Sequence, residues 1–355
     1  MKNFKRIVMA ALAVVVATAY SMPAQQAYAQ SSASLSITPK KSYVVEPGKS
    51  IKDKLTIRNL DNTSDLNLTL RVVDFSFTDD GGTPKLLLDP NAEKTTWSLR
   101  SYLTVPKSVT IPKGSSKTLD MNLNIPKGHG AGSLYSAVIY SSAAPDGGGN
   151  VGLNASGVTL VFAQIPGKVN EDLKLEKFGA YKEATVASPA QYIFFSTEEP
   201  QRIAYTLKNN GNVTEAPVGG ITLQGWFGAP ITIENVNPSG SLALIGQSRT
   251  YTTCIKLKEA QVNFEGRKTE AKTCEAPGLW PGMYTVSLDL YYGQNGNLTK
   301  EIKGTGVFWY LPWWFIIIVL VVLAITLFYG WKLYNWVRSK LGRQPRSIKR
   351  SSRRK

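Results

Sequence analysis

The chain has 355 residues and a formal net charge of +16. Thirteen of the 41 basic residues lie in residues 1–29 and 331–355, which contain no acidic residue, so the segment between them carries 28 basic and 25 acidic residues. A segment so close to neutral has no dominant attraction for phosphate backbones, and this excludes a nucleic-acid-binding protein.

Residues 1–29 have the pattern of a secretory signal peptide. Three basic residues precede the apolar run Ile7–Tyr20, and a small-residue cleavage site, Ala27–Ala29, comes directly before Gln30. We expect this segment to be removed, which places the following residues outside the membrane. The alternative is an uncleaved anchor, which would add a second membrane span.

Residues 30–305 are predicted to form β-strands throughout. Short runs alternate apolar and polar residues and are separated by Gly, Pro and Asn turns at intervals of roughly 8–15 residues, as in β-sandwiches. No stretch shows a helical period. The clearest alternations are Leu119, Met121, Leu123 and Ile125; Leu134, Val138 and Tyr140; Ile203, Tyr205 and Leu207; and Tyr284, Val286, Leu288 and Leu290.

The run Leu66–Phe77 changes phase in its middle. Its apolar residues alternate up to Val72, and Phe75 and Phe77 then continue on the other face. A β-bulge at Val72–Val73 would produce such a change, because one extra residue reverses the side to which later residues point.

The two halves of the segment follow the same plan. KLTIRNLDNTS (54–64) and AYTLKNNGNVT (204–214) are both strands that run into Asn-rich turns. We therefore expect two immunoglobulin-like β-sandwiches in tandem, at 30–166 and 167–305.

Cys254 and Cys274 are the only cysteines. An oxidising compartment permits a disulfide between them, which would close a loop of about 20 residues and stabilise the fold by roughly 3 kcal/mol. Two free thiols or a metal pair are the alternative. A four-ligand zinc site does not fit a chain with a single histidine.

The sequence offers no catalytic constellation, so we expect no catalytic, cofactor-binding or metal-binding residues. His129 lies in a glycine-rich turn with no local nucleophile or carboxylate. Residues 78–82 (TDDGG) read as a hairpin turn, because the acidic spacing of a calcium loop is missing. Trp226–Phe227 and Leu279–Trp280 are expected in a sandwich core, with an aromatic platform for sugars as the alternative.

Residues 308–330 are predicted to be a transmembrane helix. Leu311–Tyr329 is uncharged, and its nineteen residues would span about 28 Å, close to the hydrocarbon thickness of a bilayer. Tryptophan and tyrosine crowd both ends, as at membrane interfaces. The tail 331–355 carries ten basic residues, which predicts a cytoplasmic C-terminus and a single-pass type I protein of the cell membrane.

Three segments resemble the WxL-interacting protein family of bacterial surface proteins. They are VVEPGKSIKDKLTIRNLDN (44–62), LNLTLRVVDFSF (66–77) and the long segment SLRSYLTVPKSVTIPKGSSKTLDMNLNIPKGHGAGSLYSAVIYSS (98–142). The resemblance implies an N-terminal domain that binds peptidoglycan and a second domain that binds host or partner surface proteins. It assigns no ligand-contacting residues, and the second half of the chain resembles the family less.

The function predicted from the sequence is therefore a membrane-anchored, non-catalytic binding protein of the bacterial cell surface. Peptidoglycan and another surface protein are the expected partners. The alternative is an extracytoplasmic assembly chaperone that binds clients by strand addition. An enzyme such as a wall hydrolase is a third hypothesis, which would need acidic or nucleophilic groups that the sequence does not show.

Overall fold

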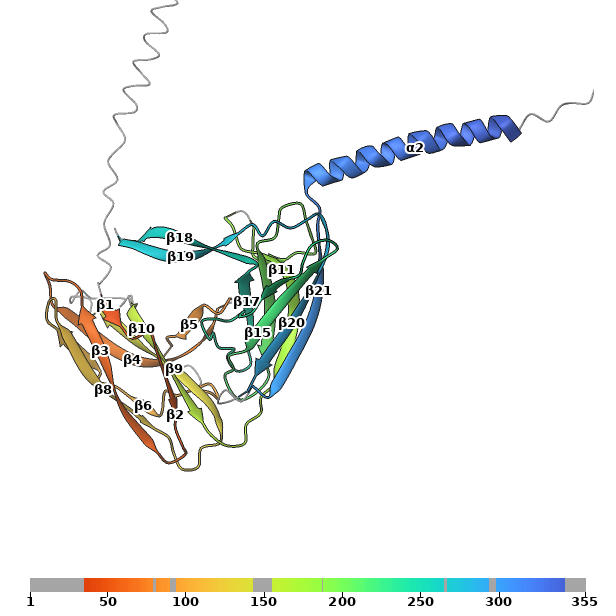
Figure 1. The fold of residues 1–355 in the computed structure, drawn as a ribbon. Coiled ribbons are helices and arrows are strands. Elements are labelled where there is room, and N and C mark those ends of the chain that lie inside the picture. The colour runs from red at the N-terminus through yellow and green to blue at the C-terminus, as the bar shows by residue number, and fades with distance from the viewer. Residues whose placement is uncertain are drawn as a thin grey trace, which may run out of the picture.

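The computed structural model describes residues 35–78, 81–89, 94–142, 155–186, 188–264, 267–293 and 298–341. The predicted signal peptide and residues 342–355 of the predicted tail lie outside the described residues. So do Asp79 and Asp80 of the turn at 78–82. The described part is mostly β-structure and ends in one long helix (Figure 1).

Ten strands form what we call the N-terminal sheet pair. One sheet has the order β1 (Leu35–Ile37), β3 (Ser50–Asn59), β8 (Ser116–Asn124) and β6 (Leu103–Thr104). The other sheet has the order β2 (Lys40–Val44), β10 (Ala155–Ile165), β9 (Gly132–Ser142), β4 (Leu66–Phe77) and β5 (Pro84–Leu87), and β7 (Ser108–Ile111) also pairs with β4. The pairing is antiparallel except between β2 and β10.

Nine further strands form the C-terminal sheet pair. One sheet has the order β12 (Gln191–Tyr192), β11 (Leu173–Lys182), β14 (Arg202–Asn209) and β17 (Ser248–Cys254). The other has the order β13 (Phe195–Ser196), β21 (Lys300–Tyr310), β20 (Gly282–Tyr292), β15 (Val218–Gly225) and β16 (Ile231–Ile233). The strands β18 (Lys256–Phe264) and β19 (Arg267–Glu275) pair only with each other, and we call them the arm hairpin.

Each sheet pair has its own apolar core, as expected for a sandwich. In the N-terminal pair the predicted alternation of β8 is confirmed, because Leu119, Met121 and Leu123 are all buried against residues of the facing sheet. In the C-terminal pair the alternating residues of β14 and β20 meet in a second cluster in the same way. The sandwich-like, mostly β fold class is therefore confirmed.

A third apolar cluster lies outside both sandwich cores, on the other face of β9. Tyr135, Ala137 and Ile139 are fully buried there and pack with Leu244 from the segment between β16 and β17. The C-terminal half of the chain thus covers the outer face of an N-terminal sheet. In Figure 1 the two sheet pairs are inclined to each other like the arms of a V.

The same cluster explains the phase change in β4. Residues at even positions up to Val72 face the N-terminal core, whereas Val73 and Phe75 face the third cluster. The pairing of β4 with β9 runs without a register shift through Val73. The predicted bulge at Val72–Val73 is therefore wrong, because a regular strand buried on alternate faces along its length gives the same sequence pattern.

Hydrogen bonds also hold the two sheet pairs together. The Ser133 amide donates to the Asn212 carbonyl (3.0 Å), and the Thr214 amide donates to Ser133 Oγ (3.0 Å). Gly132 has a φ of +146°, and a Cβ there would lie 2.8 Å from the Asn212 carbonyl oxygen. Only glycine fits this close approach without strain.

The apolar helix α2 extends over Trp313–Leu341. It is the one helix of the described residues that is long and apolar enough to cross a membrane. It begins five residues later than the predicted 308, because β21 continues pairing with β20 to Tyr310. It also continues through residues that the sequence assigned to the tail.

Removing the Phe75 ring should test whether the third cluster stabilises the fold. The ring is 1% exposed and lies 5.1 Å from that of Tyr135, so Phe75→Ala should lower the free energy of unfolding by about 3–5 kcal/mol. The measurement is thermal or denaturant unfolding of the full chain in nanodiscs. Val44→Ala, at a residue 60% exposed, is the control and should change stability by less than about 0.5 kcal/mol. Equal stabilities of the two variants would contradict the prediction.

Candidate functional site

The described residues hold no group of three or more His, Cys, Asp or Glu side chains that could bind a metal ion. His129 lies in its predicted turn between β8 and β9. Its Nδ1 is 2.8 Å from the Gly130 carbonyl oxygen, and its ring meets the Tyr102 ring edge-on at 5.4 Å. These contacts position the turn and supply no proton-transfer partner.

A buried carboxylate that the sequence analysis did not single out lies in β4. Asp74 Oδ1 accepts hydrogen bonds from Ser98 Oγ (2.7 Å) and Ser136 Oγ (2.9 Å), and Ser136 Oγ accepts one from the Leu99 amide (3.1 Å). All three polar side chains are buried. The cluster fastens the segment that precedes β6 onto β9, which is a structural role.

The arm hairpin is a piece of regular structure that belongs to neither of the two sandwiches. Its nine pairs run from Lys256↔Glu275 to Phe264↔Arg267, so each strand is roughly 30 Å long. In Figure 1 it extends to the left from the C-terminal sheet pair. Because it forms a sheet of two strands, the outer edge of each strand has no strand neighbour in the described chain.

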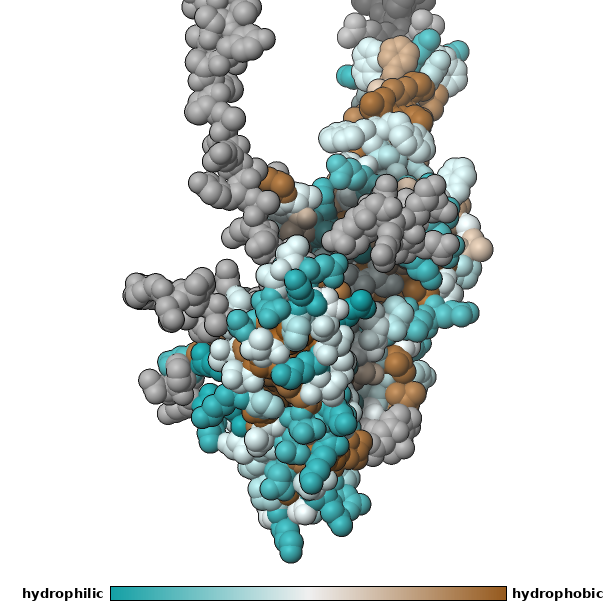
Figure 2. Space-filling model, turned by 90° about the vertical axis from the view of Figure 1, so that its left-hand side faces the viewer, coloured by the Kyte–Doolittle hydropathy of each residue, from teal (hydrophilic) through white to brown (hydrophobic). Residues whose placement is uncertain are grey.

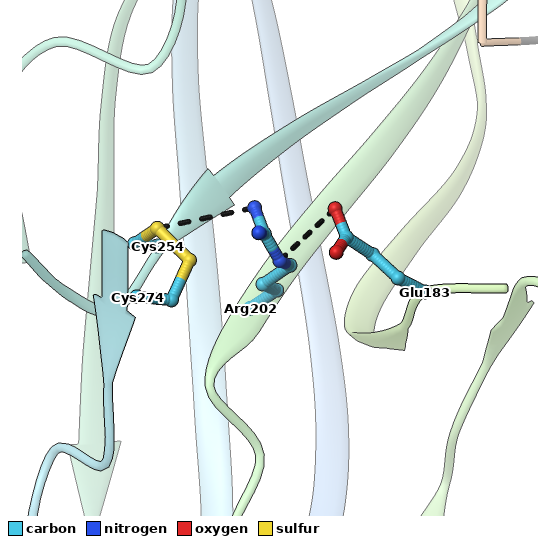
Figure 3. Close-up of a disulfide and its surroundings, with 4 residues drawn as sticks. All are labelled: Glu183, Arg202, Cys254 and Cys274. Atoms are coloured by element: carbon cyan, nitrogen blue, oxygen red, sulfur yellow. Dashed lines mark hydrogen bonds and ion pairs between the residues drawn. A yellow bond between two sulfur atoms is a disulfide. The ribbon is translucent and has the colours of Figure 1, made fainter. Parts of the chain in front are cut away.

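The base of the arm hairpin is firmly attached. Cys254, the last residue of β17, forms a disulfide with Cys274 of β19. Figure 3 shows this bond beside Arg202, whose guanidinium lies 3.9 Å from Cys254 Sγ and forms an ion pair with Glu183 (3.1 Å). Ile255, between β17 and β18, is buried in the C-terminal core. The arm therefore leaves the sandwich in a fixed direction.

An isolated two-stranded ribbon is at best marginally stable in water. The disulfide and the buried Ile255 compensate by holding both strands at one end, which leaves the outer edges available for hydrogen bonding. Unpaired strand edges invite pairing with another chain, so natural proteins usually cover or blunt them. An edge kept open on an anchored ribbon is a candidate binding site.

A second candidate is the pocket at the junction of the two sheet pairs. It is lined by residues of both, including Lys40, Ser133, Glu215 and Leu242. Glu215 is 3% exposed, and its backbone pairs with Ala243, which holds the segment that covers β9. Its Oε1 has no hydrogen-bond partner among the described residues. Burial, and secondarily the charge of Glu171, raises the pKa of Glu215 to about 7.

The residue pairs Trp226–Phe227 and Leu279–Trp280, which the sequence analysis placed in a core, are mostly at the surface. Trp226, Phe227 and Trp280 are exposed, and only Leu279 is buried in the C-terminal core. The expectation of core burial is therefore wrong for three of the four residues. Their loops lie beyond the ends of β15 and β20, outside the region where the two sheets face each other.

No family model matches the chain, and no curated protein matches it. Solved structures with some similarity include the chaperone–tip adhesin complex of CFA/I fimbriae biogenesis, at 12% identity over 78% of this chain and 99% of that chain, with a TM-score of 0.35. The class 5 fimbriae chaperone CfaA has 12% identity over 76% and 98%, with a TM-score of 0.33. The E. coli chaperone DraB has 13% identity over 76% and 97%, with a TM-score of 0.30.

TM-scores this low assign neither a fold nor a function to the chain. The sandwich-like architecture is established here by the strand pairing and the two apolar cores themselves.

The raised pKa of Glu215 predicts how stability depends on pH. Because the folded-state pKa of about 7 lies above the ordinary 4.5, the contribution of Glu215 is fully present below pH 4.5 and is lost as pH rises to about 7. In thermal unfolding, Glu215→Gln should therefore be more stable than the wild type at pH 8. The expected gain in the free energy of unfolding is on the order of 3 kcal/mol, with a much smaller difference at pH 4.5. Glu46→Gln, at an exposed residue, should behave like wild type. A difference that is the same at both pH values would contradict the assignment.

Loss of the disulfide should loosen the arm hairpin selectively. In the double variant Cys254→Ser, Cys274→Ser the base loses a restraint worth roughly 3 kcal/mol, so trypsin should cut within 256–275 much faster than in the wild type. Mass spectrometry of timed digests measures this rate. Cleavage in β3, which lies in the N-terminal sheet pair, is the internal control and should not change. Equal cleavage of the arm in both proteins would show that Ile255 alone fixes its base.

Proposed function

We propose that this chain is a membrane-anchored, non-catalytic binding protein whose folded part lies outside the cell membrane. The helix α2 is the anchor, and the basic residues that follow it support a cytoplasmic C-terminus. The signal-peptide pattern of residues 1–29 supports the same orientation. The resemblance to WxL-interacting proteins further supports a location at the bacterial cell surface.

The proposed partner is another surface protein, bound at the arm hairpin. The observation that carries this proposal is the ribbon of two strands with unpaired outer edges on a disulfide-fixed base. An extended segment of a partner can add to such an edge through main-chain hydrogen bonds, while neighbouring side chains provide selectivity. The fixed base supports this mode, because a preorganised edge loses little conformational entropy on binding.

The second partner in the proposal is peptidoglycan. Its support is the family resemblance of residues 44–62, 66–77 and 98–142, together with the polar outer face formed by β3 and β8. On that face Lys52 lies opposite Asn122, and Thr56 Oγ1 lies 3.3 Å from Thr118 Oγ1. Such a face can hydrogen-bond to a polar polymer.

The alternative function is an assembly chaperone that binds clients at the same open edges. The arm hairpin supports both hypotheses, and they differ in lifetime: a structural partner stays bound, whereas a client leaves once it has assembled. Among the residues that the structure describes, we find no separate site for the chaperone hypothesis.

Replacing the arm hairpin tests the protein-partner proposal. In one variant, residues 258–272 become a Gly/Ser linker of equal length, which keeps both cysteines and removes the paired edges. Cross-linking on intact cells followed by mass spectrometry should then lose the partner found with the wild type, at unchanged membrane levels of the chain. The matched control is Lys52→Ala, Lys54→Ala on the exposed face of β3, which should keep that partner.

Other outcomes of the same experiment separate the hypotheses. One outcome is a cross-link that survives the arm replacement but is lost after muramidase digestion and in the β3 variant. This result would assign peptidoglycan binding to the N-terminal sheet pair. A cross-link that decays during a pulse–chase would favour the chaperone. An unchanged protein partner in the arm variant would overturn binding at the arm hairpin.

A further inference from the structure

The connection between the C-terminal sheet pair and the helix α2 is very short. β21 ends at Tyr310 and α2 begins at Trp313, so at most roughly 10 Å of chain separates the sheet from the helix. The Leu311 amide donates to the Ser196 carbonyl (2.9 Å), which ties the connection to the end of β13. The end of this sandwich must therefore lie close to the surface of the membrane that α2 enters.

Exposed aromatic side chains gather at this same end. Phe195 is paired with Trp309 of β21, and the indole of Trp226 packs edge-on against that of Trp309 at 5.2 Å. The loop that carries Trp280 leads directly into β20, whose first residue, Gly282, pairs with Tyr310. The members of this aromatic collar are exposed by 51–66%: Phe194, Phe195, Trp226, Phe227 and Trp280.

A surface that faces only water would not be expected to expose the aromatic side chains of the collar. Five large aromatic side chains from three separate segments are exposed at this end, and exposed apolar patches on otherwise polar surfaces mark interaction sites. In Figure 2 the face toward the viewer is mainly teal and pale, with smaller brown patches on the body and at the top. The collar lies next to the start of α2, because Phe195 pairs with Trp309, four residues before Trp313.

The chemistry of the collar fits the headgroup layer of a bilayer. Tryptophan has an apolar ring with one polar N–H, and such amphipathic rings concentrate at membrane–water interfaces. Two pairs of charged side chains lie beside the collar, Lys182 with Glu198 (3.0 Å) and Arg202 with Glu183 (3.1 Å), while Glu199 accepts a hydrogen bond from the Leu279 amide. Paired charges can enter the headgroup layer at low cost, since that layer is itself hydrated and polar.

We propose that the aromatic collar inserts into the outer leaflet of the same membrane that α2 spans. This inference rests on the proposed anchoring by α2. The lipid contact gives the C-terminal sheet pair a second attachment beside the helix, so that it does not swing freely above the bilayer.

The orientation has a consequence for binding. The base of the arm hairpin lies at the collar end of the sandwich, because Cys254 pairs with Arg202 and the Leu279 amide donates to Glu199 Oε1 (2.5 Å). A collar held in the leaflet therefore fixes the base of the arm close to the membrane surface. The inference places the partner of the arm hairpin in the membrane-proximal layer.

Photo-cross-linking to lipid tests the collar directly. The full chain is reconstituted in phosphatidylglycerol/phosphatidylcholine vesicles that contain a phospholipid with a diazirine near its headgroup, irradiated, digested and mapped by mass spectrometry. Label is expected in α2 and also in the peptides that hold Phe195, Trp226–Phe227 and Trp280. Label in α2 alone would overturn the collar, whereas absence of label from α2 would overturn the anchoring itself.

Two variants complete the test. The collar variant Trp226→Ser, Phe227→Ser, Trp280→Ser should lose label from its loop peptides and keep it in α2. The matched control is Tyr291→Ser, Leu298→Ser, which replaces two residues 40–41% exposed at the opposite end of β20, and its labelling should equal that of the wild type. Circular dichroism checks that both variants fold. If the collar variant does not fold, the labelling map of the wild type by itself decides whether the collar contacts lipid. Loop labelling that persists in a folded collar variant would show that proximity to α2, not insertion of the aromatic rings, brings these loops to the lipid.

Discussion

The pairing of β21 with its neighbours is the constraint on which the C-terminal half of the molecule depends. Its eleven residues pair with β20 from Tyr292↔Lys300 to Gly282↔Tyr310, and its end also pairs with β13. This ladder completes one sheet of the sandwich. Only two residues, Leu311 and Pro312, then separate β21 from α2. The ladder also brings the loops that carry Trp226 and Trp280 to the point where the helix begins. The proposed membrane anchor and the sandwich are thus parts of one hydrogen-bonded structure.

A comparable constraint joins the two sheet pairs. β9 is buried on both faces, since one face belongs to the N-terminal core and the other is covered by Leu244 and its neighbours. Arg249 adds to this contact, because its guanidinium lies 4.9 Å from the Phe77 ring centre. Glu215 holds the covering segment through its backbone and places a carboxyl group in the junction. The relative arrangement of the sheet pairs is therefore set by packing, not by a linker alone.

The arm hairpin differs from both sandwiches in what stabilises it. Among the described residues its strands belong to no larger sheet, and the disulfide and Ile255 attach it at its base. Such a ribbon is more exposed to exchange and to partners than a sandwich strand is. The proposed binding site is thus the element with the least internal support, and its preorganisation comes from its covalent base.

The alternation of β8, β14 and β20 and the apolar run of α2 were predictable from sequence, because period-2 burial and a continuous apolar helix leave direct signatures in residue order. The second buried face of β9, the Asp74–Ser98–Ser136 cluster and the exposure of Trp226 were not. Each depends on which distant segment packs against, or leaves uncovered, a given side chain, and local periodicity contains no such information. The sequence by itself therefore determined the strands, the candidate cysteine pair and the long apolar helix. Only the tertiary structure decided which faces meet, which edges stay open and where the aromatic rings lie, because those depend on contacts between residues far apart in the chain.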